Sequence, residues 1–211
     1  MKQIVTVLET ETGSLVEGEL DSAVTVDDLL ATQREWRPYA IKAATALARQ
    51  GSMELIPQHL HWDWTSKAPQ LDLLANSFVG LRIAGSLQGI MKLQLVGDFC
   101  RARLPEQKGQ SLVYLDYLES APWNLKPLMD ALGQQTRYSG IGSRLVRQAV
   151  EVSVDEGFGG RLGLHSLPLT ESFYRNACGM TAVGRDPSKQ NLLWCEFTKQ
   201  QANDFLAGVK S

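Results

Sequence analysis

Apolar residues in the first part of the chain switch from the spacing of strands to the spacing of a helix. The β-branched run at residues 4–7 predicts a strand, and residues 15–20 predict a returning strand after a turn at 12–14. From Thr25, a typical N-cap residue, apolar side chains recur at helical intervals. Pro38 lies inside this pattern, so we expect either a kink or two helices that meet there.

A hairpin and a central strand come next. Residues 77–83 and 87–96 predict two strands, and the Ala-Gly-Ser sequence between them predicts the turn. Residues 112–118 are nearly all apolar or aromatic, which is typical of a central strand that is covered on both faces.

Helices and strands alternate in the rest of the chain. A helix with an apolar inner stripe is expected from Ser143, a short strand at residues 161–165, a helix from Pro168 and a last strand at 191–197. Thr198 can cap a final helix. This order predicts an α/β domain on a mixed sheet. The inner stripe of the first of these helices consists of Leu145, Val146, Ala149, Val150 and Ser153.

The composition is that of one globular domain. The 211 residues are 44% hydrophobic and 21% charged, and the length is usual for a single domain. The net charge of −2 lacks the basic excess that non-specific nucleic-acid binding requires. No apolar run approaches the roughly 20 residues that span a bilayer, and the apolar run at the N-terminus is too short for a signal peptide. We therefore expect a cytoplasmic protein with no membrane and no nucleic-acid partner.

Cysteine usage argues against a metal site. The cysteines are three in number and far apart, with no CxxC pair, which excludes a zinc ribbon and fits reduced, partly buried thiols. His59 and His61 with Asp63 supply too few ligands for a metal ion. No metal is expected. The three cysteines are Cys100, Cys178 and Cys195.

Two glycines stand directly before the helix that begins near Ser143. Gly140 and Gly142 permit a turn with positive φ and a close approach of the main chain to a ligand. The helix behind them directs unpaired N–H groups and a partial positive charge at the loop, and Arg137 adds a full charge. These features suit a pyrophosphate group, and an ordinary structural turn is the alternative.

Two well-known phosphate loops do not fit this segment. A P-loop requires Lys-Ser or Lys-Thr after its last glycine, and neither glycine here has that sequence. A dinucleotide-binding fingerprint requires a third glycine, where this chain has Leu145.

The glycine segment resembles that of a known family. The pattern Arg137-x-x-Gly140-x-Gly142 resembles the Q/R-x-x-G-x-G/A motif of the GNAT superfamily, the Gcn5-related N-acetyltransferases. Residues 173–180, with the sequence Phe-Tyr-Arg-Asn-Ala-Cys-Gly-Met, are similar to the FYxxxGF signature of that family. The resemblance covers residues 25–197.

This resemblance implies the fold and the domain organisation. The expected fold is GNAT-like, a mixed, mostly antiparallel sheet flanked by helices, with an N-terminal β-hairpin and a C-terminal helix. The chain would form a single domain at 1–211, with the hairpin extension at 1–24, the core at 25–197 and the last helix at 198–211.

The resemblance also implies acetyl-CoA as the co-substrate. Its pantetheine arm would bind the main-chain edge of the central strand as an extra strand does. Its pyrophosphate would bind N–H groups of the glycine loop. The implied contacts are Tyr117, Leu118 and Glu119 on the strand, and Arg137, Tyr138, Ser139, Gly140, Ile141, Gly142 and Ser143 in the loop.

The chain departs from the family pattern at three points. The segment that connects Glu119 to Arg137 is longer than is usual in the family. Gly179 stands one residue later than the glycine of the FYxxxGF signature. The asparagine that often begins the helix of this signature is missing.

Three residues are candidates for the chemistry of acetyl transfer, in which an amine loses a proton and a thiolate gains one. Tyr174 matches the family tyrosine that protonates the thiolate, and a core aromatic side chain is the alternative. Glu119, at the end of the central strand, is a candidate base or water-orienting group, and a surface carboxylate is the alternative. His165 ends the next strand and has a suitable pKa for the same task, although a lone histidine is more often structural.

An unusual cluster of aromatic and ionisable residues is a candidate for the acceptor pocket. His61, Trp62, Asp63 and Trp64 lie in the region that borders this pocket in the family, and aromatic walls with a carboxylate suit a cationic amine. Trp123, close in sequence to Glu119, is a further candidate. Packing of these tryptophans in the core is the alternative.

The sequence thus predicts an N-acetyltransferase that transfers an acetyl group from acetyl-CoA to a primary amine of a small molecule or a protein. An acyl-CoA-binding or regulatory module without activity is the alternative, as is a different acyl-CoA or aminoacyl transferase on the same scaffold. The sequence does not determine the oligomeric state, and a homodimer is one alternative, since dimers are common in the superfamily.

Overall fold

The structure is a computed structural model that describes residues 2–208. The chain divides into two compact units whose segments alternate along the sequence. Unit 1 contains the chain up to Leu73 with Phe78–Met91 and Leu118–Gly142, and unit 2 contains Leu74–Ser77, Lys92–Tyr117 and the chain from Ser143. Because these boundaries differ from those expected at residues 24 and 197, the single domain with terminal extensions stays a prediction.

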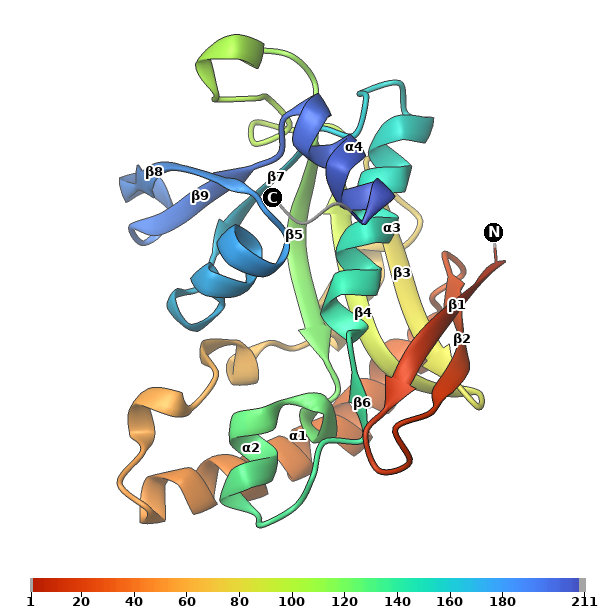
Figure 1. Cartoon of the computed structure of the whole chain (residues 1–211), viewed down its shortest axis with the longest axis vertical. Coiled ribbons are helices and arrows are strands. Elements are labelled where there is room, and N and C mark those ends of the chain that lie inside the picture. Colours follow the sequence, from red (N-terminus) through yellow and green to blue (C-terminus); the bar gives the residue numbers. More distant parts are fainter. Residues whose placement is uncertain (1, 209–211) are drawn as a thin grey trace. The chain divides into compact units, whose positions relative to one another are not determined.

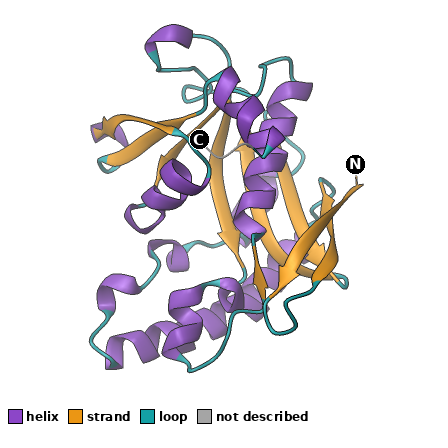
Figure 2. Ribbon diagram, in the orientation of Figure 1, coloured by secondary structure: helices purple, strands orange, loops and turns teal. Residues whose placement is uncertain are grey.

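Unit 1 contains the antiparallel strands of the N-terminal half, and Figure 2 shows its hairpin β1–β2 in orange. Strand β1 (Lys2–Glu9) pairs along its length with β2 (Leu15–Asp21), from Lys2 opposite Asp21 to Leu8 opposite Leu15. The strand order continues from β2 to β3 (Asn76–Ile83), β4 (Ser86–Gln94) and the end of β5 (Val113–Ser120).

The predicted turn of the second hairpin is confirmed at Ala84 and Gly85, and Ser86 already belongs to β4. Ala84 and Gly85 connect β3 to β4, and both have positive φ, 47° and 78°. Two residues with positive φ make a type I′ turn, whose twist matches that of the flanking strands.

Helix α1 (Val26–Arg49) begins at the predicted cap and continues through Pro38. Thr25 accepts a hydrogen bond from the Asp28 N–H group, and the Asp28 side chain accepts one from the Thr25 N–H group. The expectation of two helices that meet at Pro38 is wrong. Trp36 and Ala40, on either side of the proline, are both buried, so packing of one continuous helix outweighs the hydrogen bond that the proline cannot donate.

Helix α2 (Lys126–Ala131) lies in the excursion between β5 and the glycine loop and packs against α1, as Figure 1 shows. The Tyr39 hydroxyl donates to Gln134 Oε1 at 2.6 Å, and Gln50 Nε2 donates to the Ala131 carbonyl oxygen at 3.1 Å. The segment between α1 and β3 contains three short 3-10 helices, at Met53–Leu55, Gln58–His61 and Thr65–Gln70.

Unit 2 contains a second group of strands, in the order β5, β7 (Leu162–Ser166), β9 (Leu192–Glu196) and β8 (Thr181–Asp186). Strands β5 and β7 are parallel, and the other pairs of this group are antiparallel. Gly163 on β7 lies against the indole of Trp194 on β9, where a Cβ atom would come within 2.5 Å of the ring.

The helices of unit 2 confirm the sequence patterns. The whole predicted inner stripe of α3 (Ile141–Asp155) is buried, and the helix stops before Gly157, whose φ is 76°. Helix α4 (Lys199–Ala207) begins with the capping box of Thr198 and Gln201. The helix expected from Pro168 is a 3-10 turn followed by a π-helical turn at Phe173–Ala177.

The predicted fold class is confirmed as a mixed, mostly antiparallel sheet flanked by helices, with an N-terminal hairpin and a C-terminal helix. The sequence patterns missed β8 and the two-residue strand β6 (Tyr138–Ser139), which pairs with β1. Among residues 2–208 no helix combines the length and the apolar character needed to cross a bilayer.

Candidate active site

Glu119 is a buried carboxylate near the end of β5. Its residue is 8% exposed, and the Trp64 indole N–H group donates to its Oε2 atom at 2.6 Å. Its Oε1 atom has no hydrogen-bond partner among the residues that the structure describes. The indole therefore fixes one carboxylate oxygen and leaves the other for a proton or a ligand.

Burial changes the acidity of this group. Removal from water penalises the charged form and raises the pKa of Glu119 from 4.5 to about 7. The hydrogen bond from Trp64 and the positive charge of Lys67 act in the opposite direction and keep the rise from being larger. A carboxylate with a pKa near neutrality exchanges a proton readily at physiological pH.

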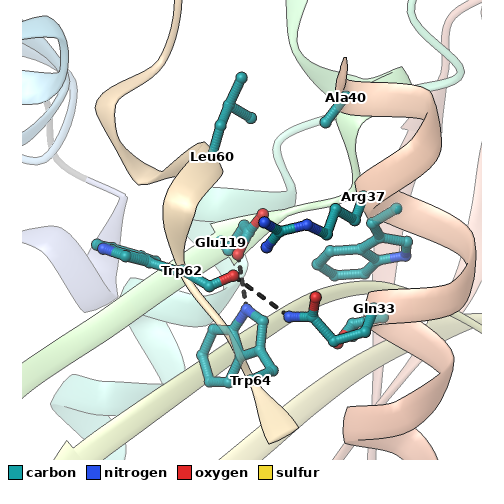
Figure 3. Close-up of a pocket in the computed structure, with 9 residues that line it drawn as sticks. Gln33, Arg37, Ala40, Leu60, Trp62, Trp64 and Glu119 are labelled. Carbon is teal, nitrogen blue, oxygen red and sulfur yellow. Dashed lines mark hydrogen bonds between the residues drawn. The ribbon is translucent and has the colours of Figure 1, made fainter. Parts of the chain in front are cut away.

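Glu119 lines a pocket that lies within unit 1, shown in Figure 3. Helix α1 forms one wall and the segment from Leu60 to Trp64 forms another. The Gln33 amide group donates to the Trp62 carbonyl oxygen at 3.2 Å and joins the two walls. The cavity is small, about 20 Å³, with room for roughly one water molecule, and it is partly open to solvent. Its lining consists of Thr32, Gln33, Trp36, Arg37, Ala40, Leu60, Trp62, Trp64 and Glu119.

Two of the predicted acceptor residues, Trp62 and Trp64, line this pocket. His61 and Asp63 do not: every second residue of this segment, Leu60, Trp62 and Trp64, lines the pocket, and His61 and Asp63 lie between them in the chain. The His61 ring is exposed, and its Nδ1 atom lies 2.6 Å from the Gln58 carbonyl oxygen.

The Asp63 side chain has a local structural role. Its Oδ1 atom accepts hydrogen bonds from the Thr65 N–H group at 2.9 Å and the Thr65 hydroxyl at 2.6 Å. The hydrogen bond from the Thr65 hydroxyl is the largest influence on the pKa of Asp63. It lowers this pKa by more than the slight desolvation raises it. The carboxylate expected in the pocket is therefore supplied by Glu119 and not by Asp63.

Trp123 lies outside the lining and has a packing role. Its ring is edge-on to Trp36, with centroids 6.4 Å apart, and its indole N–H group donates to Gln88 Oε1 at 2.8 Å. The guanidinium carbon of Arg137 lies 4.7 Å from the centroid of the Trp123 ring. Trp123 thus packs against Trp36, which lines the pocket, and Arg137 lies against the ring of Trp123.

The glycine loop has one residue in the left-handed region. Gly140 has a φ of 89°, whereas Gly142 already belongs to helix α3, which begins at Ile141. The Tyr138 N–H group donates to Asn124 Oδ1 at 3.0 Å, so that amide already has an acceptor. The N–H groups in the first turn of α3 have no acceptor inside the helix, and they follow Gly140 directly.

The pairing of the central strand β5 with β7 ends before β5 itself does. Within unit 2 the pairing of β5 with β7 runs from Val113 opposite Leu162 to Leu115 opposite Leu164 and ends there. Strand β5 continues to Ser120. The predicted contacts at Tyr117, Leu118 and Glu119 lie on this continuation.

His165 is held in a buried network of unit 2. Its Nδ1 atom lies 3.0 Å from the Tyr114 hydroxyl, and its Nε2 atom lies 3.0 Å from Asp186 Oδ2. Arg103 forms an ion pair with the same Asp186 oxygen at 2.7 Å. Burial lowers the pKa of His165, more than the bond to Asp186 raises it. Both ring nitrogens are engaged, so the geometry gives no support to His165 as a base.

Tyr174 is also buried in unit 2. Its residue is 8% exposed, and its ring packs edge-on against Phe173 with centroids 5.0 Å apart. Burial raises the pKa of the phenol, and the nearby thiols of Cys178 and Cys195 add to the rise. The phenol therefore carries its proton at physiological pH and is a weaker acid than a free tyrosine.

The cysteines and metal-binding residues add no further site. All three cysteines are buried and free. Among residues 2–208, no three side chains of His, Cys, Asp or Glu gather as ligands for a metal ion.

No family model and no curated protein matches this sequence. Solved structures do match. An acetyltransferase of the GNAT family from Listeria monocytogenes 4b F2365 is 15% identical, with 92% of this chain and 99% of that chain covered and a TM-score of 0.54.

Two further structures match at similar levels. The PaiA N-acetyltransferase from Thermoplasma acidophilum in complex with coenzyme A is 14% identical, with 85% and 97% of the chains covered and a TM-score of 0.50. The aminoglycoside acetyltransferase AAC(6')-Ib in complex with coenzyme A and kanamycin is 17% identical, with 87% and 96% covered and a TM-score of 0.50. At such low identity the likeness concerns the fold, and the chain has the fold of GNAT acetyltransferases.

Proposed function

Because the chain has this fold and a buried carboxylate in a pocket, we propose that it is an acetyl-CoA-dependent N-acetyltransferase of the GNAT superfamily. The acceptor is a primary amine that enters the pocket beside Glu119. The observation that carries the proposal is the position of Glu119: buried, bound by Trp64 through one oxygen, and with a pKa of about 7.

Glu119 acts as the general base. An amine arrives mainly as an ammonium ion, and Oε1 of Glu119 removes one proton from it. The neutral nitrogen then attacks the carbonyl carbon of the thioester: the C–N bond forms, the C–S bond breaks, and the sulfur leaves with the bonding electron pair. The nitrogen loses its second proton as the amide forms, and the thiolate gains one proton. The products are the N-acetyl amide and the free thiol, and one proton is released overall.

Aromatic walls support the binding of the ammonium ion. Trp36, Trp62 and Trp64 surround the pocket, and indole rings attract cations through their faces. Exclusion of water by the same rings maintains the raised pKa of Glu119.

The main chain offers suitable groups for acetyl-CoA. The continuation of β5 beyond its pairing with β7 suits the amide groups of pantetheine, which would extend the strand's hydrogen bonding. Around Gly140 a Cβ atom would meet no atom within 4 Å, so a bulky group has room there. The diphosphate would accept from N–H groups at the start of α3, and the amide of Tyr138 is not among them, since Asn124 binds it.

Tyr174 is the proposed donor of the proton to the leaving thiolate. The support for this role is its position in the Phe-Tyr segment, which matches the family tyrosine; burial raises the pKa of the phenol and so makes it a weaker acid than a free tyrosine. His165 has no part in this scheme, since both its nitrogens are bound.

An inactive acyl-CoA-binding module is the competing function. Desolvation of a buried carboxylate destabilises the fold, and a module without activity would gain nothing from it. The presence of Glu119 in the pocket therefore favours an enzyme over an inactive module. A cytoplasmic location remains a prediction of the sequence, and a homodimer remains one alternative for the oligomeric state.

Thiol release tests the activity. The protein is incubated with acetyl-CoA and a panel of primary amines, and free thiol is measured for the wild type, Glu119→Gln and the exposed control Glu54→Gln. We expect amine-dependent release that Glu119→Gln lowers by roughly 10²–10⁴-fold and Glu54→Gln leaves unchanged. Binding of acetyl-CoA without release for any amine would identify the inactive module instead.

A further inference from the structure

The pocket beside Glu119 contains a second ionisable side chain, Arg37 of helix α1. Figure 3 shows the side chains of Arg37 and Glu119 pointing into the same space from opposite elements. Within the part of the chain that the structure describes, Arg37 forms no ion pair. Its neighbour on the helix, Arg34, lies 3.9 Å from Glu35 and does not line the pocket. The pocket thus has one guanidinium with its donors unused.

The balance of charge in the lining limits what the pocket can bind. Arg37 and Glu119 are its only ionisable residues, and the remainder of the lining is aromatic, aliphatic or neutral polar. An acceptor with several ammonium groups needs several carboxylates, whereas this lining supplies one, and burial raises its pKa and so disfavours its charged form. A second ammonium group would lie close to the guanidinium and be repelled.

We infer that the acceptor is a small amine that also carries an anionic group, a carboxylate or a phosphate, which Arg37 binds while Glu119 receives the proton of the amine. This inference rests on the proposed function and specifies its substrate class. A guanidinium forms paired hydrogen bonds with either anion, and these bonds are about twice as strong as neutral ones. The cavity of about 20 Å³ opens to solvent, so the amine end of the acceptor would enter it and the anionic end would lie at its mouth, beside the exposed Arg37.

Other residues of the walls fit such a ligand. The Gln33 amide nitrogen is held by the Trp62 carbonyl oxygen, which leaves the amide oxygen of Gln33 to accept from the ammonium group. Since Arg37 lies on α1 and Glu119 on β5, the anion and the amine would be held by different elements, and the acceptor would be fixed at both ends.

The test uses pairs of amines that differ in the anionic group. L-Alanine is compared with L-alaninamide, phosphoethanolamine with ethanolamine, and 1,3-diaminopropane serves as a dication. Each is assayed for thiol release from acetyl-CoA with the wild type, Arg37→Gln and the matched control Arg34→Gln. Binding of the same amines is followed separately by tryptophan fluorescence, because Trp62 and Trp64 line the pocket.

We expect the wild type to prefer at least one anionic amine over its neutral partner by about tenfold or more in kcat/KM. Arg37→Gln should raise the KM of that amine roughly 10–100-fold with little change in kcat and with no effect on the neutral partner. Arg34→Gln should leave both unchanged. The two pairs show which anion, carboxylate or phosphate, is recognised.

Several results would overturn the inference. These are preference for a neutral or dicationic amine, equal effects of Arg37→Gln on both members of a pair, or no Arg37-dependent binding of either anionic amine. Thiol release without an Arg37-dependent preference would remove the inference and leave the proposed function intact. Arg37-dependent binding without release for any amine would remove the proposed function and leave Arg37 as an anion-binding residue.

Discussion

The buried carboxylate of Glu119 should destabilise the fold at alkaline pH, and its removal should relieve this. In Glu119→Gln the amide oxygen can still accept from the Trp64 indole, whose bond to Oε2 is 2.6 Å long, but the side chain never carries a charge. We therefore expect the variant to be more stable than the wild type above pH 7.

The magnitude follows from the pKa. Burial raises the pKa of Glu119 from 4.5 to about 7, and each unit corresponds to about 1.4 kcal/mol, so the ionised side chain reduces the free energy of unfolding by about 3 kcal/mol. The folded chain holds the proton more tightly than the unfolded chain. The favourable contribution is therefore complete below pH 4.5 and is lost as the pH rises through about 7.

Urea denaturation at pH 5 and pH 8.5 measures this effect. Between pH 5 and pH 8.5, the free energy of unfolding of Glu119→Gln should increase by about 2–3 kcal/mol relative to that of the wild type. The exposed control Glu54→Gln should show no such change. A difference between Glu119→Gln and the wild type that is the same at both pH values would refute the raised pKa.

Three further substitutions test separate parts of the account. Trp64→Phe removes the N–H donor that lowers the pKa of Glu119, so the acidic limb of kcat/KM should move to higher pH; an unmoved limb would contradict this coupling. Tyr174→Phe should lower kcat with little change in acetyl-CoA affinity, since only the phenol is lost, and an unchanged kcat would exclude Tyr174 as the acid. Gly163→Ala places a Cβ atom 2.5 Å from Trp194, which should cost about 1–3 kcal/mol of stability in urea denaturation; wild-type stability would show that this packing is less tight than described.

Local sequence signals predicted much of the fold. The caps at Thr25 and Thr198 depend on residues three positions apart, and the turn at Gly85 depends on two residues, so both are visible in the sequence. Strand β8 was missed because most of its residues are exposed at a sheet edge and lack a buried apolar face. Strand β6 has two residues and exists through its pairing with β1.

The candidate site was predicted only in part. The resemblance pointed to Glu119, and the unusual composition pointed to Trp62 and Trp64. Arg37 was missed because an arginine on a solvated helix face has no local signal, and only the tertiary structure places it beside the carboxylate.

For His165, the sequence suggested a catalytic role that the structure does not support. A histidine at a strand end is typical of a catalytic base as well as of a structural residue. Its partners Tyr114 and Asp186 come from other strands, and the sequence does not show that they occupy both ring nitrogens.

Calorimetric titration with acetyl-CoA tests the central claim most directly. The account predicts saturable heat with one molecule bound per chain, which Gly140→Val reduces, since a β-branched residue is strained at a φ of 89° and would block the approach of the diphosphate. Absence of binding at millimolar acetyl-CoA, with the wild-type protein folded, would contradict the claim.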